Sequence, residues 1–319
     1  MKKYFSLASW LIALLVTAGA LLYLESDFLW KVQEQNLFLN TSLFFKEQMV
    51  VPGGLLSWLG AYLTQFFYYP WMGTLLLCLL WLVLLWLVKR AFQLSDAWSV
   101  LALVPVGLLL LTIVDMGYWV YMLKLQGHVF VGTLGTMAVA ALLWGYRVLP
   151  NRYYLRPLLI VVTTAVGYPL MGIYGLAAAL LMGIWSWRLE SGTHWKKIGY
   201  GLLALISVAI VPLIFYRQVY YQTNLANIYY AELPLYYLTE EYHAYYIPYY
   251  LLAAFFLLMV ILPRNPLSPI KTYAIQGLTF VALVVGIVHF WYKDENFHHE
   301  LKMQHCIEEN DWDGVVCGD

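Results

Sequence analysis

The chain has 319 residues, of which 62% are hydrophobic and only 11% are charged, whereas a soluble globular domain has about 25% charged residues. Lys and Arg number 18, as do Asp and Glu, so the formal net charge is zero and no overall field favours nucleic acid. This composition excludes a soluble domain and gives no support for a nucleic-acid partner. It predicts an all-α, polytopic integral membrane protein with lipid as its main partner.

Nine segments are apolar over lengths that suit membrane-spanning helices, which need about 20 residues each. They are residues 5–24, 71–88, 98–114, 129–145, 158–167, 172–187, 198–215, 249–262 and 273–290. The first segment resembles a signal peptide, but its apolar core is long and no A-x-A site follows it. We therefore expect a retained membrane anchor.

The basic residues predict a cytoplasmic N-terminus. If nine spans alternate from there, twelve of the 18 Lys and Arg residues fall in inside segments. Most acids fall outside, with Asp96 and Glu190 as the inside exceptions. Short inside turns with little room explain this asymmetry, or else the outer face carries the chemistry. We expect a transmembrane domain over residues 1–292 with the C-terminus outside.

The first outer loop, over residues 25–69, is unusually polar for a segment between two spans. Apolar residues recur at helix-like spacing among polar ones, which predicts a helix lying in the membrane plane. They are Phe28, Leu29, Val32, Leu37, Phe38 and Leu39. Thr41 and its neighbours can cap the following turn. Pro52-Gly53-Gly54 then interrupts the chain before a second amphipathic helix, over Leu55–Tyr69. Pro70 is suited to begin the next span, because its missing N–H costs nothing there.

This long first outer loop with interfacial helices and acids resembles the GT-C superfamily of membrane glycosyltransferases, which use polyprenyl-phosphate sugars. The resemblance covers residues 1–150 and is one of order and sidedness. It implies a catalytic acid early in this loop, where Asp27 and Glu34 lie. It also implies a second functional acid after the third span, where Asp115 lies in TIVDMGYWVYMLK. The paired acids of many members are absent here, because Asp27 and Glu34 stand apart.

The stretches QEQNLFL and PGGLLSWLGAYLTQFFYYPWMG also resemble an uncharacterised family of polytopic inner-membrane proteins from Bacteroidota. That resemblance implies a location in a bacterial inner membrane, with a periplasmic C-terminus. It implies no activity.

Sugar transfer from a lipid phosphate needs a base for the acceptor hydroxyl, and cations or an acid-held divalent metal for the departing phosphate. Glu34 or Asp27 could be the base, and Asp115 could hold a metal or orient the acceptor. Lys124, Arg217 or Lys31 could meet the phosphate. Each acid also has a plain alternative: a solvated helix face for Glu34, a helix cap for Asp27 and an interfacial ion pair for Asp115.

The outer segment over residues 216–248 is rich in tyrosine. Tyrosine favours the membrane interface, and its flat ring also stacks on sugars while its hydroxyl bonds to theirs. We therefore name Tyr237 and Glu241 as candidate substrate-binding residues. Glu240, Glu241 and His243 lie close together in the sequence, but no ligand spacing supports a metal site.

Two further features leave alternatives open. The stretch GYPLMGIYG over Gly167–Gly175 is either a tight outer turn or a broken helix of the kind that lines transporter sites. The polar tail, over residues 293–319, is expected to be helical and resembles the start of a helical-repeat unit. It would dock on the outer loops or continue into a repeat domain that recruits a protein partner. A non-enzymatic scaffold is therefore the alternative function, and a transporter comes third.

Overall fold

The computed structural model describes residues 2–115, 125–150, 154–190, 193–220, 224–234, 246–262, 269–291, 295–308 and 310. Throughout these residues the regular structure is helical, without a strand. All nine apolar segments predicted from the sequence lie in helices. The all-α class is therefore confirmed, and the apolar helices agree with a membrane protein.

Five described helices are long and apolar enough to cross a membrane. They are α1 (Lys2–Leu24), α5 (Pro70–Phe92), α8 (His128–Val148), α11 (His194–Gln218) and α13 (Pro269–Trp291). Four shorter apolar elements accompany them: η2 (Asp96–Ala102) with α6 (Leu103–Val114), α9 (Leu155–Met171), α10 (Ile173–Leu189) and α12 (Ile247–Ile261).

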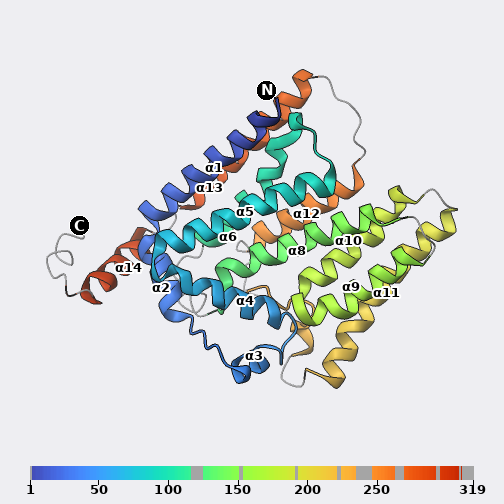
Figure 1. Cartoon of the computed structure of the whole chain (residues 1–319), viewed down its shortest axis with the longest axis horizontal. Helices are drawn as coiled ribbons and strands as arrows, with labels where there is room; N and C mark the ends of the chain where they lie inside the picture. Colours follow the sequence, from blue (N-terminus) through green and yellow to red (C-terminus); the bar gives the residue numbers. More distant parts are fainter. Residues whose placement is uncertain are drawn as a thin grey trace.

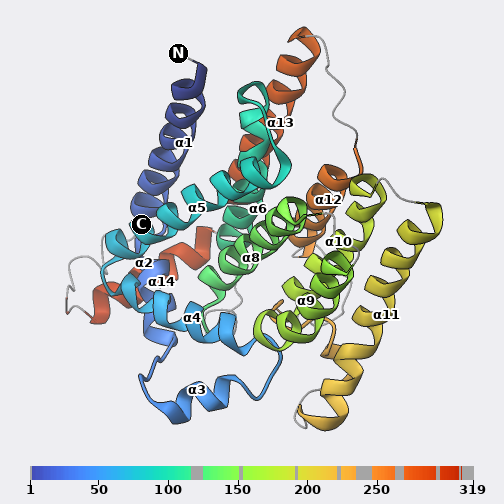
Figure 2. The ribbon, with the colours of Figure 1, turned by 45° about the vertical axis from the view of Figure 1, so that its right-hand side comes forward.

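Helices α5, α8 and α10 form the centre of the bundle, where α8 packs against both α5 and α10 (Figure 1). Helices α1, α11 and α13 lie at the periphery, where many of their apolar side chains are exposed. Helices α1 and α13 overlap in Figure 1, but Figure 2 shows them apart. Lipid is the natural partner for this peripheral apolar surface, because soluble monomers rarely expose so much of it.

The first outer loop contains α2 (Ser26–Gln35), α3 (Ser42–Gln48), α4 (Gly54–Thr64) and the short η1 (Gln65–Tyr68). The predicted cap is confirmed, because Thr41 Oγ1 accepts a hydrogen bond from Phe44 N–H at 3.2 Å. The first expected helix is shorter than predicted, because α2 ends at Gln35 and Leu37, Phe38 and Leu39 lie outside it. The short helix α3 lies between α2 and α4. The segment between α2 and α3 packs on α4, because the Phe38 ring contacts the rings of Trp58 and Tyr62.

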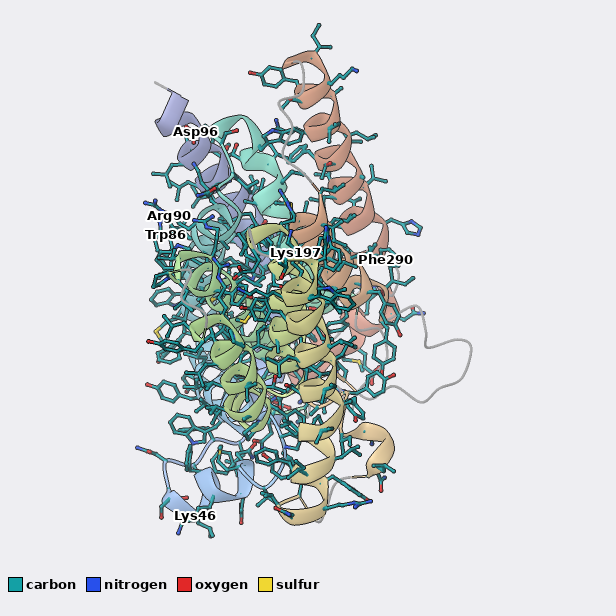
Figure 3. The ribbon with its side chains drawn as sticks, turned by 90° about the vertical axis from the view of Figure 1, so that its right-hand side faces the viewer. Lys46, Trp86, Arg90, Asp96, Lys197 and Phe290 are labelled. Atoms are coloured by element: carbon teal, nitrogen blue, oxygen red, sulfur yellow. The ribbon has the colours of Figure 1, made fainter. Side chains whose placement is uncertain are left out.

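The two ends of the molecule carry different charged residues. Figure 3 places Arg90 and Asp96 toward one end and Lys46 of α3 at the other. We call these the basic end and the α3 end. At the basic end, Arg147 donates to Ala91 O at the end of α5, at 2.7 Å. Arg188 donates to Val260 O and Leu262 O at the end of α12, at 3.0 and 2.7 Å. These arginines satisfy helix-terminal carbonyls and suit the negative end of the helix dipole.

A buried ion pair also lies at the basic end. Arg156 of α9 donates to Glu190 Oε1 at 2.8 Å, and the two side chains are only 6% and 7% exposed. The guanidinium also lies over the ring of Tyr146, and it bonds to Leu189 O. The pair ties the start of α9 to the end of α10.

We expect Arg156→Met to destabilise the fold by about 3–5 kcal/mol, because Glu190 would keep a buried charge without its partner. Thermal unfolding of the purified protein in detergent measures the change. Lys89→Met is the matched control, since its ion pair with Asp96 is more exposed and is worth at most about 1 kcal/mol. Equal losses for the two variants would contradict this prediction.

The predicted helix end at Gly167 was wrong. Helix α9 continues through Pro169 to Met171, and α10 begins immediately after Gly172, which has a φ of +56°. The interruption is thus confined to Gly172. Gly167 and Gly175 pack backbone to backbone, because a Cβ on Gly175 would lie 2.4 Å from the Gly167 carbonyl carbon. This close approach lets α9 and α10 pack together as neighbours.

Candidate functional site

Three segments that are distant in the sequence meet at the α3 end. The N–H of Gly53, in the Pro-Gly-Gly turn before α4, donates to Pro169 O at 2.9 Å. The N–H of Ile173, at the start of α10, donates to Ala231 O at 3.1 Å. The Pro-Gly-Gly turn, the α9–α10 junction and the segment over residues 224–234 are therefore joined by backbone hydrogen bonds.

Two glycines leave room for the side chain of Glu232 at this junction. A Cβ on Gly53 would lie 2.0 Å from Glu232 Cγ, and a Cβ on Gly172 would lie 3.0 Å from the same atom. Both glycines have positive φ angles, +91° and +56°, which other residues adopt only at a cost. The two turns are thus shaped around one carboxyl side chain.

Glu232 is half-buried and adopts a φ of +75°, which is uncommon outside glycine. Burial raises the pKa of Glu232 to about 8, against a partial lowering by its hydrogen bond with Ser57. Ser57 Oγ lies 2.9 Å from both carboxyl oxygens. A hydroxyl has one hydrogen, so Ser57 donates to one oxygen, and a protonated Glu232 can donate back from the other. The carboxyl therefore holds a proton near neutral pH.

Tyr174 of α10 contributes a buried hydroxyl, which lies against α8 near Gly132. The side chain is only 7% exposed, and its hydroxyl has no hydrogen-bond partner within the described parts of the chain. It is close enough to interact electrostatically with Glu232 and Tyr249. The ring lies against α8, where a Cβ on Gly135 would come within 2.4 Å of it. A buried hydroxyl without a partner is costly, which favours a bound ligand or water here.

Further polar groups gather where α6 ends and α8 and α12 begin. The side chain of Tyr249 hydrogen-bonds to that of Thr112, and the imidazole of His128 hydrogen-bonds to the Thr112 backbone. Asp115 ends α6 and is 8% exposed, with its N–H donating to Leu111 O at 3.0 Å. Polar residues from α4, α6, α8, α10, α12 and the 224–234 segment thus lie at the same end of the bundle.

The acids predicted in the first outer loop lie in a different contact group. Asp27 Oδ1 is 2.6 Å from His305 Nδ1, and Glu34 forms an ion pair with Lys31 at 2.6 Å. Their helix, α2, packs mainly against α1, α5, η1 and α14 (Glu295–Glu308). Asp115 belongs to α6, which packs mainly against α5, α8, α12 and α13.

The predicted binding residues are only partly described. Arg217 lies in the last turn of α11 and is exposed. Lys124, Tyr237 and Glu241 lie outside the described residues, as do Glu240 and His243. Their roles stay predictions. Where the structure describes the chain, no group of three or more His, Cys, Asp and Glu residues could hold a metal ion.

Nothing in the sequence distinguishes Glu232 from the many other outer acids. Its only local peculiarity is its place between Ala231 and Leu233-Pro234, which predicts a turn and no chemistry. Ser57 and Tyr174 likewise stand in ordinary apolar surroundings. Nothing in the spacing of these residues links them, and only the contacts at the α3 end do.

Comparison with known proteins adds one assignment. Residues 2–317 match the model of a family of unknown function (DUF6057). The chain belongs to this family. The expectation of an uncharacterised family is confirmed, and the match includes the tail helix as well as the apolar helices. No curated protein and no solved structure shows significant similarity to the chain. The likenesses to GT-C enzymes and to Bacteroidota proteins stay predictions.

Proposed function

We propose that this protein transfers a sugar from a polyprenyl-phosphate donor to an acceptor hydroxyl at the outer face of a bacterial inner membrane. The observation that carries the proposal is Glu232. Burial raises the pKa of this carboxyl to about 8, and it interacts electrostatically with the buried hydroxyl of Tyr174, which has no hydrogen-bond partner among the described residues. Perturbed carboxyl groups of this kind are typical of sites that move protons.

In the proposed reaction, Glu232 is the base. The acceptor hydroxyl gives its proton to the Glu232 carboxylate while its oxygen bonds to the anomeric carbon of the sugar. The bond from that carbon to the phosphate oxygen breaks, and its electron pair leaves with the polyprenyl phosphate. Ser57 holds the carboxylate in position. The Tyr174 hydroxyl is a donor for a sugar or phosphate oxygen.

The residues expected from the sequence fit around this centre as further parts of the proposal. Asp115 would orient the acceptor or join a divalent metal, and Lys124 and Arg217 would meet the departing phosphate. Tyr237 and Glu241 would bind the sugar. Asp27 and Glu34 are the alternative bases, although both carboxylates already have partners on α2 or α14.

The proposed site requires the α3 end to face outward, and we propose nine spans with a cytoplasmic N-terminus. Arg90 and Lys197 lie well away from Lys46 at the α3 end (Figure 3), and Arg147 and Arg188 bind the ends of α5 and α12, which supports this orientation. Labelling with a membrane-impermeant maleimide tests it in intact cells. Lys46→Cys should react from outside, whereas Arg90→Cys should react only after permeabilisation. The reverse pattern would overturn the orientation.

Release of polyprenyl phosphate from a panel of polyprenyl-phosphate hexoses tests the activity. Purified protein in lipid nanodiscs would be mixed with each donor and with a detergent-soluble acceptor alcohol or glycan. We expect release with at least one donor, and its loss in Glu232→Gln. If no donor is consumed, or if the variant is as active as the natural protein, the transferase proposal fails.

A non-enzymatic scaffold is the second candidate, and one observation favours it. The first-loop acid Asp27 and the cation Lys31 both contact the tail helix α14, so this part of the outer loop serves to hold the tail. Met303 and Ile307 on α14 remain exposed. For a scaffold, Glu232→Gln would leave the cellular function intact, whereas loss of α14 would abolish it.

A further inference from the structure

The tail helix α14 lies against α2 at the point where α1 ends (Figures 1 and 2). Trp291 Nε1–H, at the end of α13, donates to Glu25 Oε1 at 2.6 Å. His298 Nδ1 lies 3.5 Å from the other oxygen of Glu25. Further along α14, His305 Nδ1 lies 2.6 Å from Asp27 Oδ1. Two histidine–carboxylate contacts therefore join the tail to the start of α2.

An aromatic contact fixes the second of these pairs. The Trp30 ring stacks on the His305 imidazole with centroids 4.6 Å apart and an interplanar angle of 23°. Lys31 lies near the same indole and forms an ion pair with Glu308 at 3.1 Å. An imidazolium between an indole face and a carboxylate gains from both, whereas a neutral imidazole loses most of that attraction.

At Glu25, in contrast, the neutral form of the side chain is the favoured one. Its side chain is 3% exposed, and burial raises its pKa to about 8, against a partial lowering by the Trp291 hydrogen bond and with a small further rise from Asp27. Below that pH the group is neutral and its burial is tolerated. Above it, the contact must enclose a carboxylate, which is unfavourable unless His298 is charged.

We propose that α14 and α2 form a proton-dependent latch, which is closed in mildly acidic conditions and loosens as the pH rises above neutral. Both kinds of contact act in the same direction. Histidine is the side chain that changes charge between pH 5 and 8, and loss of its proton weakens a contact with a carboxylate such as that of Asp27. Ionisation of Glu25 then removes the neutral form that the buried site favours.

The other charged groups that the structure describes around the latch are paired or exposed. Lys31 forms ion pairs with Glu34 and Glu308. Glu300, Lys302 and His299 lie on exposed parts of α14, and His289 packs on Phe290 in α13. Among the described residues, the histidine–carboxyl contacts that join α14 to α2 are therefore those of His298 with Glu25 and of His305 with Asp27.

Hydrogen exchange measured by mass spectrometry tests the latch on the full chain in nanodiscs. Backbone protection in residues 26–35 and 295–308 would be compared at pH 6.0 and 8.5, after correction for the chemical exchange rate. We expect the protection to be about tenfold lower at pH 8.5. A tenfold change is expected when the contact between α14 and α2 loses a stabilisation equivalent to one pKa unit. Peptides from α5 should show no such change.

Variants decide whether the named groups are responsible. Glu25→Gln keeps an acceptor for Trp291 but cannot ionise, so it should reduce the ratio of protection between the two pH values. Adding His298→Gln and His305→Gln should bring that ratio close to one. His299→Gln, an exposed histidine on the same helix, is the matched control and should keep the natural ratio. Equal protection of the natural protein at both pH values, or a full ratio in the triple variant, would overturn the proposal.

Discussion

Glu232→Gln is expected to lower the rate of sugar transfer by about 10²–10⁴-fold, the usual contribution of a positioned general base. Glutamine keeps the size of the side chain and an acceptor for Ser57, but it cannot take the acceptor proton. Transfer would be measured as release of polyprenyl phosphate in nanodiscs. Glu47→Gln, which changes an exposed acid in the first outer loop, is the matched control and should keep full activity.

The pH dependence of this activity follows from the pKa of about 8. The carboxylate form, which is the base, is a minor species at pH 6 and dominates above pH 8. The rate should therefore rise about tenfold per pH unit below the pKa and level off above it. A rate that is independent of pH between 6 and 8, or an active Glu232→Gln variant, would rule out Glu232 as the base.

The same raised pKa links stability to pH. The folded carboxyl holds its proton up to about pH 8, whereas the unfolded group has a pKa of 4.5. The unfolded state thus loses its proton first, so the stability from this group is complete below pH 4.5 and is lost as the pH rises toward 8. Melting temperatures of the natural protein and of Glu232→Gln, compared across this range, should show a smaller decline for the variant.

Gly127→Ala is expected to destabilise the fold by about 3 kcal/mol or more, through overpacking and a left-handed backbone. Gly127 has a φ of +68°, and a Cβ there would lie 2.3 Å from the Gly60 carbonyl carbon and 2.4 Å from Ala61 N. Both contacts are with the backbone of α4, so no side-chain rotation can relieve them. The Gly127 N–H also donates to the Asn36 side chain at 2.8 Å.

Thermal unfolding in detergent measures this loss. Gly277→Ala is the matched control, because Gly277 lies within α13 with no atom within 4 Å of an added Cβ. Alanine is favoured over glycine in a helix, so this variant should be as stable as the natural protein or slightly more so. A Gly127→Ala protein with an unchanged melting temperature would show that α4 does not rest on the start of α8 as described.

The helices and several of their ends can be predicted from the sequence alone. Each apolar segment carries its own signal, because a run of apolar residues is helical in lipid whatever its neighbours do. Local caps are determined in the same way: Thr41 lies three residues before the N–H it accepts from, and Pro70 begins α5. The end of α9 was misplaced because the last turn of a helix can accommodate a proline, here Pro169. The packing of α9 against α10 favours this last helical turn.

The residues of the candidate site come together only in the tertiary structure. Ser57 and Glu232 are 175 positions apart, and Asn36 and Gly127 are 91 positions apart. Hydrogen bonds over such separations leave no local pattern, since any polar residue in an outer loop would look the same. What selects Glu232 is its enclosure between Gly53 and Gly172, because burial raises its pKa and the hydrogen bond with Ser57 lowers it only in part. That enclosure exists only once the outer loop has packed onto the ends of the membrane helices.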